Sequence, residues 1–204
     1  MLGASAEKPV WGSGWHYPVP DYLNKQGRFP AVASQEFHAG HRGLDILLAR
    51  RGTSHAGQPV IVEGFPPGQK STDGITTEAD ASGKFFAPKG LWILAAREGK
   101  VWSVQPTNNG VMVVIDHGPP WATFYGHLDS CRLKPTTRGE SGETVAAGEI
   151  IGTMGAGLNT DPAKGLVDGQ HLRHLHFEAW YKGDGSHAVD PEAEMRSWKR
   201  SVWQ

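Results

Sequence analysis

The stretch from His174 to Trp180 places the tightest limit on the fold, because histidine or glutamate alternates there with apolar residues. A period of two is typical of a β-strand with one face in a core. The polar face would then carry three side chains: His174, His176 and Glu178. Its two imidazoles would stand about 6.5 to 7 Å apart along the strand. One could bind a metal ion while the other stands over whatever the metal binds. Two surface histidines on a half-buried strand are the alternative.

A second group of metal-binding side chains lies far upstream, where His41 and Asp45 are four residues apart among glycines. Neutral imidazole and carboxylate are both good zinc ligands. Two histidines and one aspartate leave a fourth tetrahedral position open, as in a catalytic zinc site and unlike a closed structural one. Structural sites are rich in cysteine, and Cys131 is the only cysteine of the chain. The sequence therefore excludes a zinc-finger or ribbon site.

The rest of the chain favours an all-β fold. It contains 27 glycines and 14 prolines, and long segments with an apolar period of 3.6 residues are few, so many turns and short strands are expected. Strands are predicted where β-branched and aromatic residues cluster between turn residues: Leu91–Ala96, Lys100–Val104, Gly110–Asp116 and Trp121–His127. Glu98-Gly99 and Asn109-Gly110 supply turns between them.

Four blocks of the chain follow one another in a recognisable order. They are His41-x-Gly43-x-Asp45, the hairpin of Val114–Gly118 and Thr123–Leu128, Val145–Gly152, and His174-Leu175-His176-Phe177-Glu178, with Val189-Asp190-Pro191 closing the series. In content and order they resemble the lysostaphin-type (LytM-like) zinc metallopeptidases. The resemblance implies two antiparallel sheets that form a narrow groove, with loops and a short C-terminal helix.

The resemblance also implies the roles of five residues. One Zn²⁺ per chain would be held by His41, Asp45 and His176, while His127 and His174 would assist as catalytic residues. A zinc-bound water would attack the scissile carbonyl, and histidine can accept or deliver the proton near neutral pH. Which of the two catalytic histidines is the general base stays open. The implied activity is endopeptidase cleavage of peptide stems or cross-bridges of bacterial peptidoglycan. Some family members carry a tyrosine shortly before the first ligand, and Ala33–His38 contains none.

The other histidines and Glu178 receive weaker interpretations. His16 is interpreted as a hydrogen-bonded surface residue, and His38 as a residue at the rim of the site or a substitute ligand. His55 is expected to be uninvolved and His117 to be structural. His171 and His187 are candidates for a position behind the ligands or on the surface. Glu178 either orients a ligand from behind or is a solvated strand carboxylate.

One zinc metallopeptidase domain is predicted for all 204 residues. It would have an aromatic and proline-rich arm over residues 1–36, an inserted loop region over about 47–84, and a helix over 190–203. Asp190 can cap that helix, and Pro191 suits its first turn. The insertion is interpreted as a rim of the cleft that selects the substrate, with a floppy surface excursion as the alternative.

Charge and hydropathy limit the partners. A net charge of -1 gives no basic field for nucleic acid, and no run of about eighteen apolar residues could span a membrane. The first residues lack the pattern of a signal peptide. Export, an endolysin-like phage lysis system and delivery in a virion therefore stay open as routes to the cell wall or periplasm. A non-catalytic regulator of wall hydrolysis, or a peptidoglycan-binding virion component, is the alternative function. Retention of all five site positions favours the enzyme.

Overall fold

A computed structural model of the chain describes residues 9–24, 27–35, 37, 40–49, 53–55, 58–60, 84–85, 90–136, 142–155, 174–183 and 185–204. Within these ranges β-strands predominate. The helical elements there are the 3₁₀ turn Gly185–His187 and the four-residue helix α1, Glu192–Met195. The expected all-β class with a short C-terminal helix is confirmed.

The strands are named in chain order. They are β1 Asp21–Asn24, β2 Gly27–Phe29, β3 Ala31–Gln35, β4 Leu44–Ala49, β5 Thr53–His55, β6 Gln58–Val60, β7 Lys84–Phe85, β8 Trp92–Leu94, β9 Gly99–Thr107, β10 Gly110–Asp116, β11 Trp121–Cys131, β12 Thr144–Val145, β13 Ile150–Met154, β14 Leu175–Tyr181, β15 Ala188–Val189 and β16 Val202–Trp203.

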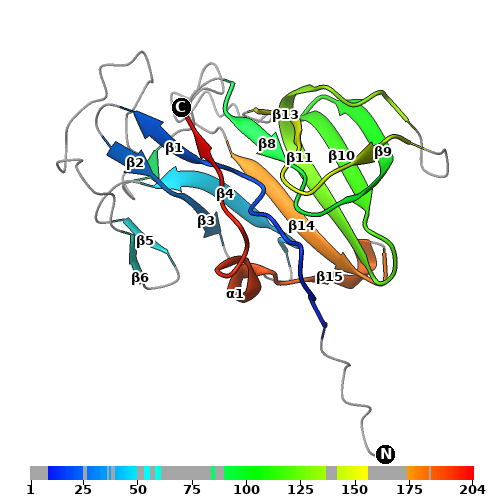
Figure 1. The fold of residues 1–204 in the computed structure, drawn as a ribbon, viewed down its shortest axis with the longest axis horizontal. Coiled ribbons are helices and arrows are strands. Elements are labelled where there is room, and N and C mark those ends of the chain that lie inside the picture. The colour runs from blue at the N-terminus through cyan, green and yellow to red at the C-terminus, as the bar shows by residue number, and fades with distance from the viewer. Residues whose placement is uncertain are drawn as a thin grey trace, which may run out of the picture.

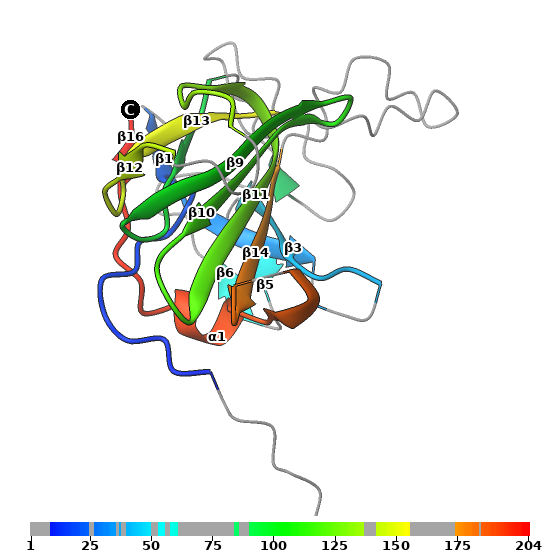
Figure 2. The ribbon, with the colours of Figure 1, turned by 90° about the vertical axis from the view of Figure 1, so that its right-hand side faces the viewer.

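Strand β14 joins the two halves of an eleven-stranded sheet. The main path runs β12-β9-β10-β11-β14-β4-β3, with β13, β8, β15 and β7 attached beside it, and its recorded pairings are antiparallel. In Figure 1 the orange β14 lies between the green strands β9 to β11 and the blue and cyan strands β3 and β4; Figure 2 shows it beside β11. The residues of β14 can therefore meet side chains from both halves of the chain.

The hairpin of β9 and β10 forms as its sequence predicts. Gly110 adopts a positive φ of 90° at the turn, which suits glycine because it has no Cβ. The Thr107 hydroxyl donates to the Gly110 carbonyl at 2.6 Å and accepts from the Asn109 amide at 3.0 Å. The turn therefore supplies its own hydrogen bonds.

The apolar face of β14 lies in the core, as the alternation predicts. Leu175, Phe177 and Ala179 are each at most 1% exposed. Phe177 packs edge-to-face against Tyr125 of β11, with ring centroids 5.4 Å apart. Burial of one such large side chain is worth about 1.5 to 3 kcal/mol. The opposite face of the strand is left for polar side chains.

The C-terminal segment departs from the expected helix over 190–203. Helix α1 ends at Met195, and the chain then runs along the N-terminal segment, where β16 pairs in parallel with β1. Trp198 stacks on Trp15 with ring centroids 4.7 Å apart, and Arg200 forms an ion pair with the buried Asp21. These tertiary contacts outweigh the local tendency to continue the helix, because a regular helix through these residues could not make them all.

The N-terminal segment contains strands as well as an irregular stretch. In the described residues before Asp21, the side chains of Trp15, Tyr17 and Val19 are buried. The residues that follow form strands, with β1 and β2 in a three-stranded sheet and β3 at one end of the main path. The prediction of a single arm over residues 1–36 was therefore wrong for its second half. Burial of alternate side chains such as Ala31 and Ala33 accounts for the strand β3.

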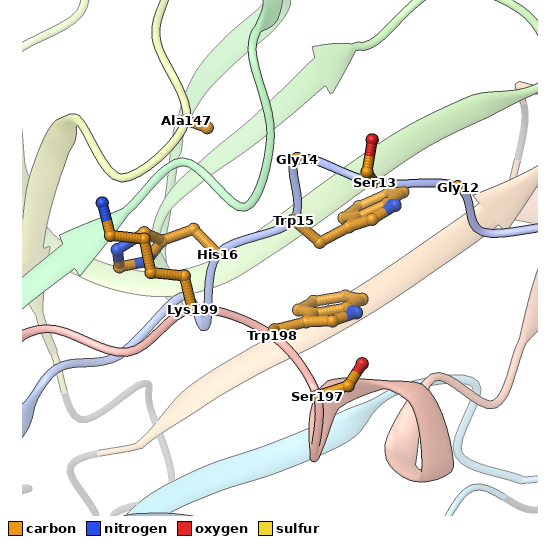
Figure 3. Close-up of a pocket in the computed structure, with 9 residues that line it drawn as sticks. All are labelled: Gly12, Ser13, Gly14, Trp15, His16, Ala147, Ser197, Trp198 and Lys199. Atoms are coloured by element: carbon orange, nitrogen blue, oxygen red, sulfur yellow. The ribbon is translucent and has the colours of Figure 1, made fainter.

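A hollow of about 500 Å³ marks the junction of the N-terminal and C-terminal segments. In Figure 3 the rings of Trp15 and Trp198 lie face to face there, with His16 and Lys199 beside them. The lining also includes Ala147 from the turn before β13. The two ends of the described chain therefore pack against each other through aromatic rings.

The predicted insertion is described only in part. Strands β5 and β6 form a two-stranded hairpin, and residues 61–83 lie outside the described residues. Its interpretation as a substrate-selecting rim therefore remains a prediction. In the described part of the chain, no helix has the length and apolar character needed to cross a membrane.

Candidate metal and catalytic site

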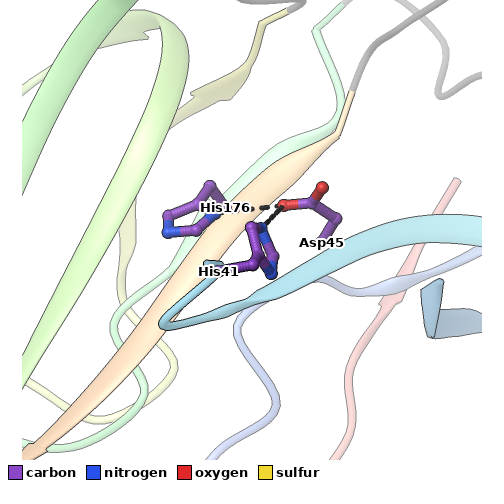
Figure 4. Close-up of side chains that lie close together, drawn as sticks. All are labelled: His41, Asp45 and His176. Carbon is purple, nitrogen blue, oxygen red and sulfur yellow. Dashed lines mark hydrogen bonds and ion pairs between the residues drawn. The ribbon is translucent and has the colours of Figure 1, made fainter. Parts of the chain in front are cut away.

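The pairing of β4 with β14 builds the centre of the site. In this antiparallel pair Asp45 lies directly opposite His176, although 131 residues separate them in the chain. His41 precedes β4 by one short turn, so its imidazole reaches the same point. Figure 4 shows the three side chains converging from β4, from the segment before it and from β14. The structure thus brings together the three residues predicted as metal ligands.

The donor atoms of His41 and His176 both lie close to the Asp45 carboxylate. Asp45 Oδ1 lies 3.2 Å from His41 Nε2 and 3.1 Å from His176 Nδ1. All three donor atoms lie within 4.8 Å of one another. Ligands on a tetrahedral zinc ion with bonds of about 2.0 to 2.1 Å would stand about 3.3 to 3.4 Å apart. The two spacings to Asp45 Oδ1 therefore fit a zinc ion, and the two histidine nitrogens, which lie within 4.8 Å of each other, would close around the ion on binding.

Gly43 allows the first motif to lie against the His176 ring. A Cβ at this position would stand 2.6 Å from the Phe177 carbonyl oxygen and 2.8 Å from two atoms of the His176 imidazole. These distances are too short for any side chain. Glycine between His41 and Asp45 is therefore a packing requirement of the site.

The two histidines predicted to be catalytic lie beside the three donor atoms. His174 Nε2 stands 3.8 Å from Asp45 Oδ1. The ring centroid of His127 is 4.7 Å from that of His174 and 6.0 Å from that of His176. All five predicted site residues thus meet at one place.

His127 reaches the site because β11 is irregular at this point. The register between β10 and β11 shifts by one residue between the pairs Val111–Leu128 and Val113–Tyr125, and His127 has a φ of +66°. A bulge re-aims a side chain, and a positive φ is uncommon for a residue other than glycine. The His127 Nδ1–H donates to the Asn109 carbonyl at 3.1 Å. Its Nε2 is therefore the nitrogen that carries the lone pair.

The charges around His176 favour a cation. Burial alone would lower the pKa of His176, but its hydrogen bonds to Asp45 and Glu178 raise that pKa to about 9. Burial would raise the pKa of Asp45, but the hydrogen bond from His176 and the nearby His174 and His41 lower it. Without a metal, the His176 imidazole is therefore protonated and lies between the Asp45 and Glu178 carboxylates. A metal ion binding there would displace that proton, so its affinity would rise with pH.

Burial lowers the pKa of His127, and the neighbouring His174 and His176 lower it further. The hydrogen bond to the Asn109 carbonyl raises this pKa but does not outweigh the other effects. This imidazole is therefore neutral at pH 7. A neutral imidazole can accept a proton.

Two residues complete the polar face of β14. Glu178 Oε1 accepts a hydrogen bond from His176 Nε2 at 3.0 Å, and Glu178 Oε2 accepts one from Trp180 Nε1 at 2.6 Å. Glu178 therefore contacts a candidate ligand and is not merely solvated. The sequence interpretation missed Trp180 and the Asn109 carbonyl. The period of two could have found Trp180, because it places this residue on the face of His176 and Glu178.

The described histidines outside the site have structural partners. His16 is buried and not on the surface as expected, because it contacts the Tyr17 carbonyl at 3.0 Å and the Ser201 hydroxyl at 3.1 Å where the chain ends meet. His117 bonds the Glu98 carbonyl and the Thr123 hydroxyl. His187 lies in the 3₁₀ turn beside Ser186. His38, His171 and the His55 side chain lie outside what the structure describes.

Comparison with known protein families gives a match over more than half of the chain. Residues 80–191 match the family described as Peptidase family M23. The chain belongs to this family. The M23 match includes His127, His174 and His176, whereas His41 and Asp45 precede it. The resemblance to lysostaphin-type (LytM-like) peptidases is thereby confirmed.

Individual proteins and solved structures similar to this chain cover different shares of it. It is 30% identical over 110 residues to the cell division protein DipM of Caulobacter vibrioides, which is 52% of this chain and 15% of DipM. A zinc-containing peptidase from Vibrio cholerae aligns with 87% of this chain and 39% of its own, at 21% identity and a TM-score of 0.45. The catalytic domain of lysostaphin from Staphylococcus simulans aligns with 57% of this chain and 82% of its own, at 23% identity and a TM-score of 0.41. The chain thus spans only part of DipM and of the Vibrio peptidase.

Proposed function

We propose that this M23-family chain is a zinc-dependent endopeptidase that hydrolyses peptide bonds in the stems or cross-bridges of bacterial peptidoglycan. The observation that carries the proposal is the convergence of donor atoms from His41, Asp45 and His176 within 4.8 Å of one another. His127 and His174 lie beside that convergence. The substrate class is inferred from the resemblance to lysostaphin-type peptidases.

The donor set supports one zinc ion per chain. Two imidazole nitrogens and one carboxylate oxygen suit zinc and leave a position for substrate or water. When bound, Zn²⁺ would supply a Lewis acid that polarises a peptide carbonyl and lowers the pKa of water to about 7. In this proposal Asp45 Oδ1, His41 Nε2 and His176 Nδ1 hold the ion.

His127 is suited to accept the proton from the attacking water. Its Nδ1–H is held by the Asn109 carbonyl, so Nε2 is available as a base, and its lowered pKa keeps it neutral at pH 7. The imidazolium formed in this way can then deliver a proton to the leaving amine. His174, whose ring lies 4.7 Å from that of His127, would donate a hydrogen bond to the developing oxyanion.

The proposal is tested with purified peptidoglycan sacculi of several cross-bridge types. The released fragments are analysed by mass for new amino termini, with the native chain, the chain treated with chelator, and the same chain after zinc is restored. His176→Ala is the site variant, and His187→Ala is its control, because His187 lies in a turn outside the site. We expect cleavage by the native, zinc-restored and His187→Ala forms only.

Two outcomes would contradict the proposal. Full cleavage by the metal-free chain would remove zinc from the mechanism. Binding to sacculi without release of any new amine, by a chain that holds zinc, would favour a non-catalytic wall-binding or regulatory protein. Because each released fragment identifies the bond that was cut, a positive result also separates stem from cross-bridge cleavage.

A further inference from the structure

The imidazole of His176 is held at both of its nitrogens. Nδ1 faces Asp45 Oδ1 at 3.1 Å, and Nε2 faces Glu178 Oε1 at 3.0 Å. An ionised carboxylate can only accept hydrogen bonds, so the Glu178 contact places a hydrogen on Nε2. Nδ1 faces the side where Asp45 and His41 place their donor atoms, so Nδ1 is the nitrogen that would give up its proton and bind a metal. Glu178 thus acts on the side of the ring away from the donor atoms.

Glu178 is itself held in place. Its second oxygen, Oε2, accepts from Trp180 Nε1 at 2.6 Å. The Trp180 ring stacks on Phe124 of β11, with centroids 5.8 Å apart and planes 23° apart. Phe124 in turn meets the edge of the His176 ring at 6.0 Å.

Strand pairing explains why this chain of contacts is continuous. In the β11–β14 pair, Phe124 lies opposite Glu178, and the period of two puts His176, Glu178 and Trp180 on one face. The side chains of His176 and Glu178 are each only 16% exposed. A hydrogen bond to a carboxylate is stronger in such a partly buried place than in water.

We propose that Glu178 is a positioning residue that fixes His176 in the orientation and tautomer presenting Nδ1 to a metal, and that Trp180 holds Glu178 in that role. This inference rests on the zinc site of the proposed function and adds the residues that give the site its geometry. Metal-binding histidines commonly donate their other N–H to a carboxylate, and loss of such a partner typically weakens metal binding about 10- to 100-fold.

Zinc affinity of the metal-free chain provides the test, because it needs no substrate. It is measured by competition with a chromophoric chelator. We expect Glu178→Ala to weaken zinc binding about 10- to 100-fold. Glu178→Gln should fall between native and Glu178→Ala, because its amide oxygen can still accept from Nε2–H. Trp180→Phe should weaken binding less than Glu178→Ala, because it removes the indole N–H but keeps a ring on Phe124.

Matched controls separate positioning from general damage. Glu194→Ala removes an exposed carboxylate of α1, and Trp92→Phe changes a partly exposed tryptophan of β8; both should bind zinc like the native chain. Thermal unfolding of each metal-free variant shows whether it folds. If Glu178→Ala does not fold, Glu178→Gln and Trp180→Phe decide the question.

A second measurement reports the nitrogen that binds the metal. The ¹⁵N resonances of the His176 ring in the zinc-loaded chain should show a protonated Nε2 in the native protein, and a mixture of coordinating nitrogens in Glu178→Ala. The proposal is overturned if folded Glu178 variants bind zinc as tightly as the native chain through the same nitrogen, or if the native chain binds no zinc. Zinc binding that depends on Glu178 in a chain without peptidase activity would instead reject only the proposed function.

Discussion

At the scale of single residues, the two histidines of the His-x-His pair look alike in composition but differ in surroundings. His176 Nδ1 stands 3.1 Å from Asp45 Oδ1, whereas His174 Nε2 stands 3.8 Å from it and neighbours His127. The difference arises because His176 lies inside β14, opposite Asp45, while His174 precedes the strand. Ligand and catalytic roles are therefore expected to separate on mutation.

We predict that His176→Ala loses zinc and activity together, because it leaves two protein ligands where a catalytic site uses three. His127→Ala and His174→Ala should each keep most of the zinc and lose about 10² to 10⁴ in rate, as expected for loss of a general acid or base. Zinc content and single-turnover rates measure the two effects. If His174→Ala lost the metal while His176→Ala kept it, the two assignments would have to be exchanged.

Gly43→Ala should damage the site without touching a ligand. Its Cβ would stand 2.6 Å from the Phe177 carbonyl oxygen and 2.8 Å from the His176 ring. The β4–β14 contact would have to open, at a cost of about 1 to 3 kcal/mol in the free energy of unfolding. Denaturant unfolding and zinc titration of the variant measure the result. Unchanged stability and zinc affinity would show that the two segments can part freely.

At the scale of elements, β14 lies at the centre of the site because its two neighbouring strands bring in other parts of it. Strand β4 supplies Asp45, and β11 supplies His127 through its bulge. The same strand buries Leu175, Phe177 and Ala179 on its other face. The core therefore fixes the register that places His176 opposite Asp45, since a slip by one residue would exchange the two faces.

The insertion is the element whose role is still a prediction. If residues 52–80 rim the cleft, their replacement by a short Gly/Ser linker should change the preference among peptidoglycan types more than it changes zinc occupancy. The reason is that His41, Asp45 and His176 all lie outside the replaced segment. Digestion of the same set of sacculi by both forms measures the preference. Identical cleavage of every sacculus type by both forms would favour a floppy excursion.

At the scale of the whole molecule, His117 links stability to pH. It bonds the Glu98 carbonyl at 2.9 Å and the Thr123 hydroxyl at 2.7 Å, and burial lowers its pKa to about 4. The unfolded chain, with an ordinary histidine pKa near 6.5, takes up a proton at higher pH than the folded chain does. Stability is therefore unaffected by this group above about pH 6.5 and falls as the pH drops toward 4.

We predict that the metal-free native chain loses about 2 to 2.5 kcal/mol more stability between pH 7 and 4.5 than His117→Gln does, because glutamine does not titrate. Denaturant unfolding at several pH values measures this difference, and comparison with the variant cancels the other histidines. His187→Gln, outside the core, should follow the native curve. Parallel curves for native and His117→Gln would contradict the assigned pKa.

The amino-acid sequence by itself determined the local features. The alternation over His174–Trp180 defined a strand and its two faces, because side chains of a strand alternate. Asn109-Gly110 gave the turn between β9 and β10. Asp190-Pro191 indicated where the helix starts, but not that it ends at Met195. Capping signals act over one turn, so they specify a start and carry no information on length.

Only the tertiary structure decided which distant residues meet. The C-terminal segment leaves the helix because Trp198 and Arg200 find partners in Trp15 and Asp21. His127 faces the site because it adopts a left-handed backbone conformation in the bulge of β11. No local preference of histidine specifies that conformation. The alignment of Asp45 with His176 depends on the pairing of β4 with β14. Such pairings are set by burial of the apolar faces of strands far apart in sequence, and that burial exists only once the sheet has formed.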